Sequence, residues 1–231
     1  MCSTGVQDMK PNALVVGGSS GLGLELARLL RDDYNVIITG RQDPKEENMQ
    51  FRRLELGSID DVQLFEDLNF LANSSPSIHL LIYAAGFYQE GRVDELTAQD
   101  IISAFQVGLV APTMLLGRLL QGGQKLTGFI AITSTSQWTP RELEPVYAAA
   151  KAGLGMLAQS VSLDPRVHKV LVVGPAGMNT RFWRETKRDM SILLDPRWVA
   201  EQTLELYRGN FNYQLARVLR EPPRVEVVET R

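Results

Sequence analysis

Short apolar runs alternate with longer amphipathic stretches along this chain, and that alternation restricts the folds open to it. The runs are rich in β-branched and aliphatic residues, whereas the longer stretches repeat apolar residues at spacings of three and four. Strands that alternate with helices and read as near-continuous apolar runs favour a parallel sheet covered on both faces. We therefore predict one α/β domain over residues 1–231, built on a doubly wound parallel sheet of about seven strands. The expected strands are residues 13–16, 35–39, 51–56, 79–84, 128–133, 169–173 and 213–219, and the expected helices are residues 21–31, 60–71, 97–120, 145–163 and 196–208.

Length and charge limit the function classes. The chain has 231 residues, and 24 Lys and Arg against 27 Asp and Glu give a net charge of −3. This length suits one α/β domain, and the mildly acidic balance gives no general attraction to nucleic acid or anionic membranes. No apolar run approaches the roughly 20 residues that span a bilayer, and the N-terminus lacks a signal-peptide pattern. We expect a cytoplasmic protein with no nucleic-acid or membrane partner, and loosely held ends at residues 1–10 and 222–231.

The cysteine and histidine content indicates a site without metal. Cys2 is the only cysteine, and the two histidines, His79 and His168, have no neighbouring cysteine. Neither the usual zinc spacings nor an internal disulfide can be built from these residues. The composition therefore predicts a reducing compartment and no bound metal.

A glycine-rich loop joins the first expected strand to the first expected helix. A strand, glycine turn and helix in this order present backbone N–H groups and a helix N-terminus to an anion, typically a pyrophosphate. The spacing is G-x-x-x-G-x-G rather than G-x-G-x-x-G, and Leu24 stands where a P-loop needs lysine. A tight turn without a ligand is the alternative. The predicted cofactor-binding residues in this loop are Gly17, Ser19, Ser20, Gly21, Leu22 and Gly23.

The end of the second expected strand bears on the choice of cofactor. An NAD-selective site usually carries Asp or Glu about 20 residues after the loop, but Gly40 and then Arg41 follow the strand here. A guanidinium can hold a 2′-phosphate through two hydrogen bonds. Arg41 therefore favours NADP, with NADPH preferred over NADH; a surface arginine at a strand end is the alternative.

A tyrosine and a lysine four residues apart follow in an alanine-rich helical stretch. Residues at i and i+4 share one helix face, so Tyr147 and Lys151 can meet at one site. A nearby ammonium lowers the pKa of a phenol toward the range useful for proton transfer. An interfacial tyrosine and a solvated lysine are the alternative. Ser134 follows an expected strand at the edge where open α/β sheets place ligands, and Ser136 is its rival for the same role.

These motifs together resemble the short-chain dehydrogenase/reductase family, whose members have a single Rossmann-type domain. The resemblance covers residues 13 to about 219. The cofactor loop matches T-G-x-x-x-G-x-G with Val16 in place of threonine, and Tyr147 and Lys151 match Y-x-x-x-K with Ser134 at the usual distance. Residues 175–180 resemble P-G-x-x-x-T, with Ala176 in place of the glycine.

The resemblance implies roles for these residues. Tyr147 would protonate the carbonyl oxygen, Lys151 would lower the tyrosine pKa and hold the nicotinamide ribose, and Ser134 would hydrogen-bond the substrate oxygen. It also implies a homodimer or homotetramer. The further implied cofactor contacts are Glu55, Leu56, Ala84, Ala85, Gly86, Pro175, Ala176, Met178 and Thr180.

Two departures from the family pattern divide the functional hypotheses. Tyr83 replaces an asparagine that braces the sheet, and Gly108 replaces an asparagine that helps hold a water behind the lysine. A glycine also costs roughly 1 kcal/mol inside a helix. We expect an NADP-dependent carbonyl reductase or alcohol dehydrogenase, and keep as the alternative an NADP-binding regulator or scaffold without turnover. An acyl- or methyl-transfer enzyme is a more distant third, because neither needs a Tyr/Lys pair.

Substrate selectivity should come from loops at the carboxyl ends of the strands. Aromatic side chains there indicate an apolar or ring-bearing carbonyl or alcohol substrate, although each could simply pack a loop onto the domain. Few residues separate Thr180 from Asp195, so we expect a short lid and an open pocket. The predicted pocket residues are Phe87, Gln137, Trp138, Met178, Phe182 and Trp183.

Overall fold

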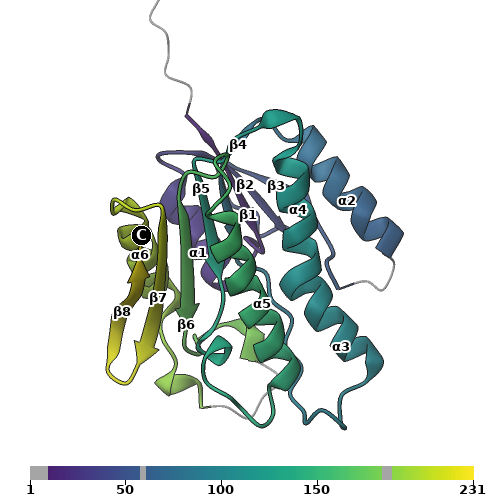
Figure 1. Cartoon of the computed structure of the whole chain (residues 1–231), viewed down its shortest axis with the longest axis vertical. Helices are drawn as coiled ribbons and strands as arrows, with labels where there is room; N and C mark the ends of the chain where they lie inside the picture. The colour runs from purple at the N-terminus through teal and green to yellow at the C-terminus, as the bar shows by residue number, and fades with distance from the viewer. Residues whose placement is uncertain (1–9, 58–60, 184–188) are drawn as a thin grey trace, which may run out of the picture.

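Eight strands form one sheet in the order β3-β2-β1-β4-β5-β6-β7-β8 (Figure 1). The computed structural model describes residues 10–57, 61–183 and 189–231. Strands β1 to β7 pair in parallel, and β8 runs antiparallel to β7. The strands are β1 (Asn12–Val16), β2 (Asn35–Gly40), β3 (Met49–Arg53), β4 (Ile78–Tyr83), β5 (Gly128–Ile132), β6 (Val170–Pro175), β7 (Tyr213–Arg220) and β8 (Pro223–Thr230).

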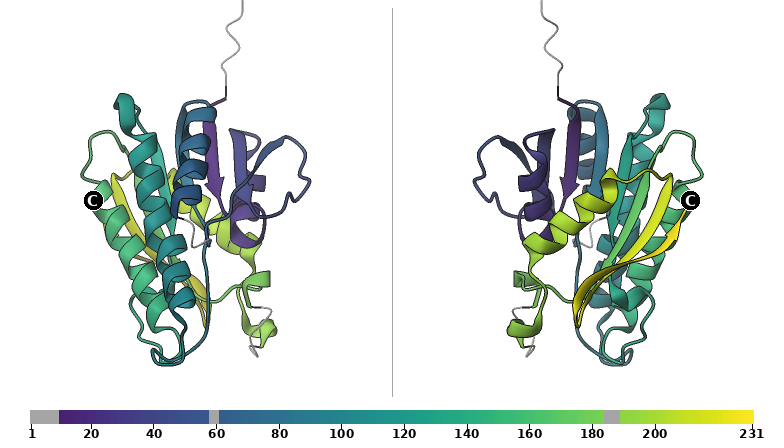
Figure 2. Two further views of the ribbon diagram at one scale, coloured as in Figure 1. Left: turned by 90° about the vertical axis from the view of Figure 1, so that its right-hand side faces the viewer. Right: turned by 90° about the vertical axis from the view of Figure 1, so that its left-hand side faces the viewer.

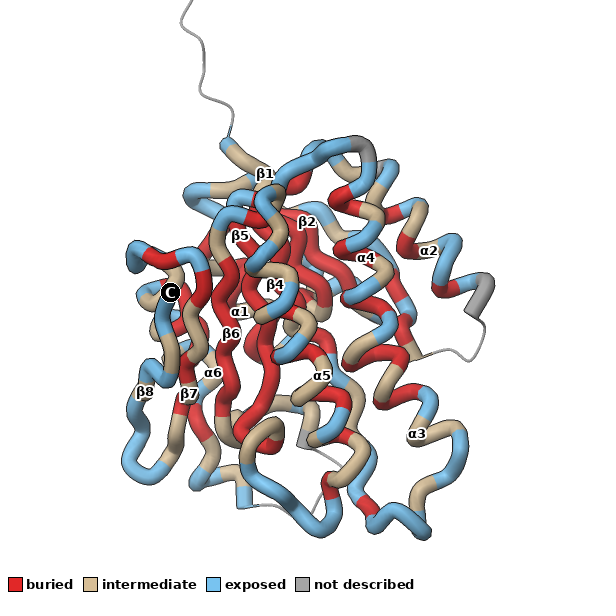
Figure 3. The backbone as a smooth tube through the Cα atoms, viewed as in Figure 1, coloured by how far each residue is buried: buried red, intermediate tan, exposed pale blue. Residues whose placement is uncertain are grey.

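Helices cover both faces of the sheet, as the two side views in Figure 2 show. One apolar core lies between the sheet and α2, α4 and α5, and a second lies between the sheet and α1 and α6. Figure 3 shows the buried residues concentrated along the central strands. The predicted Rossmann-type doubly wound sheet is therefore confirmed. The helices are α1 (Gly21–Leu30), α2 (Asp61–Ser74), α3 (Ala98–Phe105), α4 (Ala111–Leu119), α5 (Pro145–Val161) and α6 (Pro196–Arg208), with 3₁₀ turns η2 (Gln121–Gly123), η3 (Thr135–Gln137), η4 (Arg181–Trp183) and η5 (Met190–Ile192).

The C-terminal segment corrects two expectations. Residues 222–231 were expected to be loosely held, yet most of them form β8, which makes the sheet eight-stranded rather than about seven. Alternation identified β7 but not β8, because β8 lies at the sheet edge with most side chains exposed or half-buried. The third strand is Met49–Arg53 rather than residues 51–56. Cys2 and most of the predicted loose N-terminus lie outside the described residues.

The long predicted helix over residues 97–120 is interrupted by a π-helical turn. It divides into α3, the π-helix η1 (Gln106–Val110) and α4. Tyr83, fully buried at the end of β4, donates a hydrogen bond from its hydroxyl to the Val107 carbonyl at 2.5 Å. A backbone group of the π-turn is thus satisfied by a side chain from the sheet.

Residues 98–119 also correct the expectation about apolar length. This helical stretch is long and apolar enough to cross a membrane by composition alone, and half of its most apolar window is buried inside the protein. The buried part packs against α2 and α5. A core helix of a folded domain meets the same length and composition test, so the stretch is accounted for by the core.

Candidate active site

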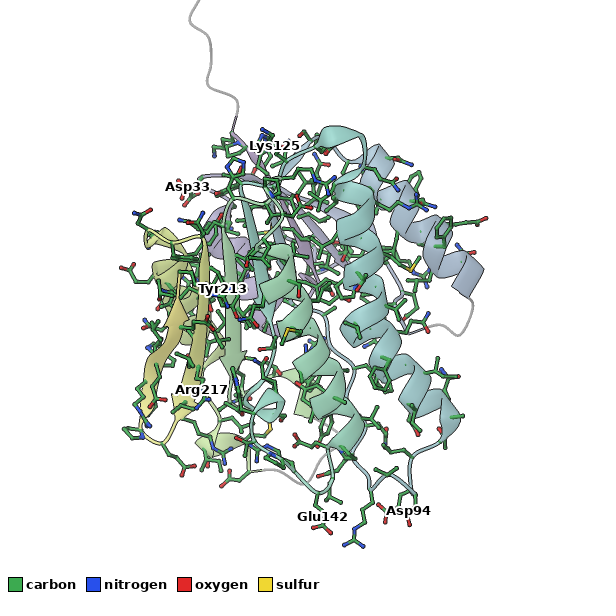
Figure 4. All side chains as sticks on the ribbon, in the orientation of Figure 1. Asp33, Asp94, Lys125, Glu142, Tyr213 and Arg217 are labelled. Carbon is green, nitrogen blue, oxygen red and sulfur yellow. The ribbon has the colours of Figure 1, made fainter. Side chains whose placement is uncertain are left out.

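A large cavity opens at the carboxyl ends of the parallel strands. Its volume is about 950 Å³, and it extends from Arg41 after β2 to Arg217 on β7. Figure 4 labels Arg217 at this end of the sheet, together with Asp94 and Glu142 in the neighbouring loops, whereas Asp33 and Lys125 mark the opposite end. Every residue predicted to be catalytic or cofactor-binding lines this one cavity: Gly17, Ser19, Ser20, Gly21, Leu22, Gly23, Arg41, Glu55, Leu56, Ala84, Ala85, Gly86, Ser134, Tyr147, Lys151, Pro175, Ala176, Met178 and Thr180.

The glycine loop fits closely between neighbouring backbones. Gly17 has φ +80°, and a Cβ there would lie 2.7 Å from the Ala85 nitrogen; a Cβ at Gly23 would lie 2.3 Å from the Gly17 oxygen. Only glycine avoids these overlaps. The loop leads directly into α1, whose first N–H groups have no earlier helical carbonyl to bind. An anion with many oxygens is the ligand that this arrangement suits.

Gly40 and Ser19 pack against each other beside the loop. A Cβ at position 40 would lie 2.5 Å from the Ser19 Cβ and 2.0 Å from its Oγ. An aspartate or glutamate at position 40 would therefore overlap Ser19. The site thus has no room at that position for the carboxylate that NAD-selective sites use.

Lys151 is a buried cation tied to two strand ends. Its side chain is 4% exposed, and Nζ donates to the carbonyls of Ile132 at 3.0 Å and Ala85 at 3.2 Å. These carbonyls follow β4 and end β5. Burial lowers the pKa of Lys151 to about 8.

Tyr147 lies one helical turn before Lys151 and has an aromatic environment. The Lys151 Nζ is 5.9 Å from the Tyr147 ring centroid. The rings of Tyr88 and Phe182 lie 5.4 and 6.0 Å from the Tyr147 ring, the first edge-on. The tyrosine is 8% exposed and lines the cavity. The predicted i, i+4 pair therefore meets inside the cavity rather than on the protein surface.

The two rival serines belong to one hydrogen-bonded chain. Ser134 Oγ donates to Ser136 Oγ at 3.2 Å, and Ser136 Oγ donates to Glu144 Oε2 at 2.7 Å. Both serines are buried and line the cavity. Ser134 also caps the 3₁₀ turn η3 by accepting from the Ser136 backbone N–H.

Glu144 is a site residue that the sequence analysis missed. It is 3% exposed, lines the cavity, and contacts Tyr88, whose hydroxyl donates to Oε1 at 3.4 Å, and Arg141, whose Nε lies 3.6 Å from Oε2. The sequence signal that could have identified Glu144 is its place directly before Pro145, the first residue of the helix that carries Tyr147 and Lys151. Burying a carboxylate is costly unless it is hydrogen-bonded and paired, as it is here.

The predicted substrate residues divide into two groups. Phe87, Trp138, Met178 and Phe182 line the cavity. Gln137 does not, because η3 directs its amide toward α5, where a Cβ on Gly155 would lie 2.8 Å from Gln137 Oε1. The side chain of Trp183 and residues 184–188, within the expected short lid, lie outside the described residues.

The histidines lie away from this cavity. His79 Nδ1 accepts a hydrogen bond from the Asn12 N–H at 3.2 Å, between the starts of β1 and β4. His168 lies two residues before β6 and donates from its backbone N–H to the Leu126 carbonyl. Among the residues that the structure describes, no three His, Cys, Asp or Glu side chains gather as metal ligands would.

Gly108 allows the π-turn to approach α5. A Cβ at this position would lie 2.8 Å from the Cβ of Ala150, which directly precedes Lys151 on α5. The Ala150 methyl group is not the flexible end of a long side chain and cannot move aside on its own. The glycine therefore sets the spacing between η1 and the helix that carries the Tyr/Lys pair.

A Gly108→Ala variant should be less stable than the wild type, although alanine is the better helix former. We expect the free energy of unfolding to fall by about 1–3 kcal/mol, because the added methyl group overlaps Ala150. The matched control is Gly117→Ala in α4, where nothing lies within 4 Å; it should raise stability by up to about 1 kcal/mol. Equal stabilisation of both variants in urea unfolding would contradict the packing account.

Lys151 should make stability depend on pH. Its pKa of about 8 in the folded protein, against 10.5 normally, means that folding below pH 8 bears the full cost of burying the charge. Between those values the unfolded chain binds more protons, so stability rises with pH. Relative to Lys151→Met, the wild type should gain about 3 kcal/mol between pH 7 and pH 11 in cofactor-free denaturant unfolding. A constant difference across this range would contradict the lowered pKa.

Comparisons with known proteins identify the family to which this chain is similar. A family model described as short chain dehydrogenase covers residues 11–191. The chain is 29% identical over 153 residues to "Uncharacterized oxidoreductase DltE" of Bacillus subtilis strain 168, spanning 61% of this chain and 60% of that relative. It is 26% identical over 178 residues to 2,3-dihydro-2,3-dihydroxybenzoate dehydrogenase of Escherichia coli strain K12, spanning 75% and 71% of the two chains.

Solved structures agree on the fold. A short chain dehydrogenase from Shigella flexneri 2a strain 301, complexed with NADP, superimposes with a TM-score of 0.75 at 20% identity, covering 90% of this chain and 97% of the other. A likeness at that identity supports the fold, and the family model supplies the assignment. Because the family model matches well over half of the chain, the protein belongs to the short-chain dehydrogenase/reductase family of oxidoreductases, which bind nicotinamide cofactors.

Proposed function

We propose that the protein transfers hydride between NADP(H) and a carbonyl or alcohol substrate, with Tyr147 as general acid and base. The observation that carries the proposal is the meeting of Tyr147 and the buried ammonium of Lys151 in the cavity that the glycine loop also lines. Of the functions weighed, only proton transfer coupled to a nucleotide cofactor needs both features in one cavity.

The cofactor supplies the hydride, and the chain's own residues bind and orient it. The glycine loop and the start of α1 suit its pyrophosphate. Arg41 would hold the 2′-phosphate, and the Ser19–Gly40 contact leaves no space for the acidic residue that selects NAD. Thr180, whose side chain lies over Gly21, would anchor the carboxamide.

Proton transfer would depend on three side chains. Tyr147 would donate its hydroxyl proton to the substrate oxygen during reduction. The Lys151 ammonium, fixed by two carbonyls, would favour the phenolate and so keep the pKa of Tyr147 near the working pH. Ser134 would turn its hydroxyl from Ser136 to the substrate oxygen and stabilise the developing alkoxide. Tyr88 and Phe182 would exclude water around the tyrosine.

A cofactor-binding regulator without turnover is the second candidate. It is favoured by Gly108, which has no side chain to hold a water behind Lys151 and which a larger residue could not replace without overlapping Ala150. Ser134, Tyr147 and Lys151 are nevertheless all present in the cavity. Their retention favours the enzyme.

We further propose that the protein works in the cytoplasm as a homodimer or homotetramer on a small-molecule substrate. Enzymes of this family act on small molecules and are typically oligomeric. Met156 on α5 is 61% exposed, as an apolar side chain at a subunit contact would be in an isolated chain. The mildly acidic net charge of −3 supports the absence of nucleic-acid and membrane partners.

Tyr147→Phe should strongly reduce turnover while leaving cofactor binding intact. Loss of the general acid should lower kcat/KM by about 10²- to 10⁴-fold, measured as NADPH consumption with a panel of ketones, aldehydes and quinones. Tyr213→Phe, outside the cavity, is the control. Tight NADPH binding without any Tyr147-dependent turnover on this panel would support the regulator instead.

Arg41→Ala should weaken NADPH selectively. The KM for NADPH should rise by about 10- to 100-fold, because a charge-assisted contact to the 2′-phosphate is lost, whereas the KM for NADH should stay the same. Arg53→Ala, an exposed arginine on β3, controls for net charge. If both cofactors weaken equally, Arg41 does not select NADP.

A further inference from the structure

Arginines gather around the cavity of a protein whose net charge is −3. Three glutamates, Glu55, Glu144 and Glu221, also line it. Arg141 lies beside Glu144, and Arg220 pairs with Glu221. The lining arginines are Arg41, Arg141, Arg181, Arg217, Arg220 and Arg224.

Arg217 differs from Arg141, Arg220 and Arg224, which pair with glutamates. It is partly buried on β7 and forms no ion pair with any residue that the structure describes. Glu226, opposite it on β8, pairs with Arg224 instead. The Arg217 Nε is fully enclosed and donates to no acceptor within the described chain. The guanidinium nevertheless keeps its charge, and no hydrogen bond to a described residue occupies its terminal N–H groups, which line the cavity.

The position of Arg217 is set by a stack on Trp138. Its guanidinium carbon lies 4.7 Å from the centre of the Trp138 ring. The indole occupies the space above Gly174 on β6, where a Cβ would lie 2.3 Å from the ring and 3.2 Å from the Ser134 carbonyl. Stacking covers one face of a guanidinium and leaves the N–H groups on its edge free to bind an oxyanion.

Sheet order separates Arg217 from the expected cofactor phosphates. The glycine loop follows β1, and four strand spacings of about 4.8 Å, roughly 19 Å in all, lie between β1 and β7. Ser134 follows β5, only two spacings, or roughly 10 Å, from β7. Arg217 is thus within reach of a substrate whose carbonyl lies at Ser134 and Tyr147.

We infer that Arg217, stacked on Trp138, binds an anionic group of the substrate, a carboxylate or a phosphate carried on a short arm beyond the reacting carbonyl. The inference rests on the proposed function and specifies its substrate class. A carboxylate presents two coplanar oxygens to the guanidinium edge and forms charge-assisted hydrogen bonds with it. Neutral ketones would occupy the same cavity without this contact.

The test compares keto acids, from levulinate upward in chain length, with their methyl esters and with matching keto phosphonates. We expect the acids and phosphonates to have lower KM values than the esters. Arg217→Leu should raise the KM for the anionic substrates by about 10- to 100-fold and leave the esters unchanged. Whichever of the two anionic classes, carboxylates or phosphonates, shows the larger rise in KM identifies the anionic group of the natural substrate. Arg217→Lys, which keeps the charge, should lose less and serves also if the leucine variant does not fold.

Arg118→Leu is the matched control, because Arg118 is also partly buried and stacked on an aromatic ring, Phe65 at 4.6 Å, but lies outside the cavity. It should change no KM. Equal effects of Arg217→Leu on acids and esters, or no effect on either, would overturn the inference while leaving the reductase intact. If no carbonyl compound is reduced, binding is measured instead, by calorimetry of the acid and the ester with the NADPH-loaded Tyr147→Phe variant, with and without Arg217→Leu. Binding of the acid alone that requires Arg217 supports the anion site. Absence of such binding overturns the inference.

Discussion

The arrangement of the site depends on a charge buried where the strands end. Lys151 has almost no contact with solvent, and its ammonium is stabilised by the carbonyls of Ala85 and Ile132. Those carbonyls are available because parallel strands leave backbone oxygens unpaired at their carboxyl ends. The lysine therefore joins α5 to β4 and β5 and fixes where Tyr147 lies. The same hydrogen bonds that make the burial tolerable also position Tyr147, the proposed proton donor.

The two departures from the family pattern are adjacent in the folded protein. Tyr83 donates to the carbonyl of Val107, and the next residue, Gly108, packs directly on Ala150 of α5. The sheet is thus connected to the π-turn by the Tyr83 phenol, and the π-turn contacts α5, which carries Tyr147 and Lys151, through Gly108. A larger residue, Tyr83, on the sheet side of the π-turn accompanies a smaller residue, Gly108, on the side that faces α5. We interpret the pair as one alternative packing of this region rather than as two independent losses.

The features that sequence patterns could predict are those set by local physics. The alternation of apolar runs and amphipathic stretches identified β1, β2, β4 to β7 and the helices, because burial on both sheet faces demands that pattern. The loop from Gly17 to Gly23 and the Tyr147–Lys151 spacing could also be predicted, because steric limits and helix periodicity act over only a few residues.

The features that stayed hidden depend on contacts between distant segments. Strand β8 mixes valines with charged residues and lies at the sheet edge, where no side chain is fully buried, so it lacks the near-continuous apolar run that marks the central strands. Glu144 and Arg217 resembled ordinary surface charges until the fold enclosed the first among Ser136, Tyr88 and Arg141 and stacked the second on Trp138. Gln137 stood beside cavity residues in the sequence, but a 3₁₀ turn rotates it toward α5. Side-chain direction within irregular turns is not encoded in spacing alone.

The contact between Ser19 and Gly40 has an evolutionary consequence. Because a Cβ at position 40 would overlap the Ser19 side chain, an acidic residue there would force the loop around Ser19 to shift. A change of nucleotide preference in this lineage would therefore need substitutions at both positions, and the order matters: the acidic residue first produces a strained loop, whereas glycine at position 19 first leaves a tolerated intermediate. The residues at positions 19 and 40 are thus coupled sterically and can be exchanged freely only as a pair.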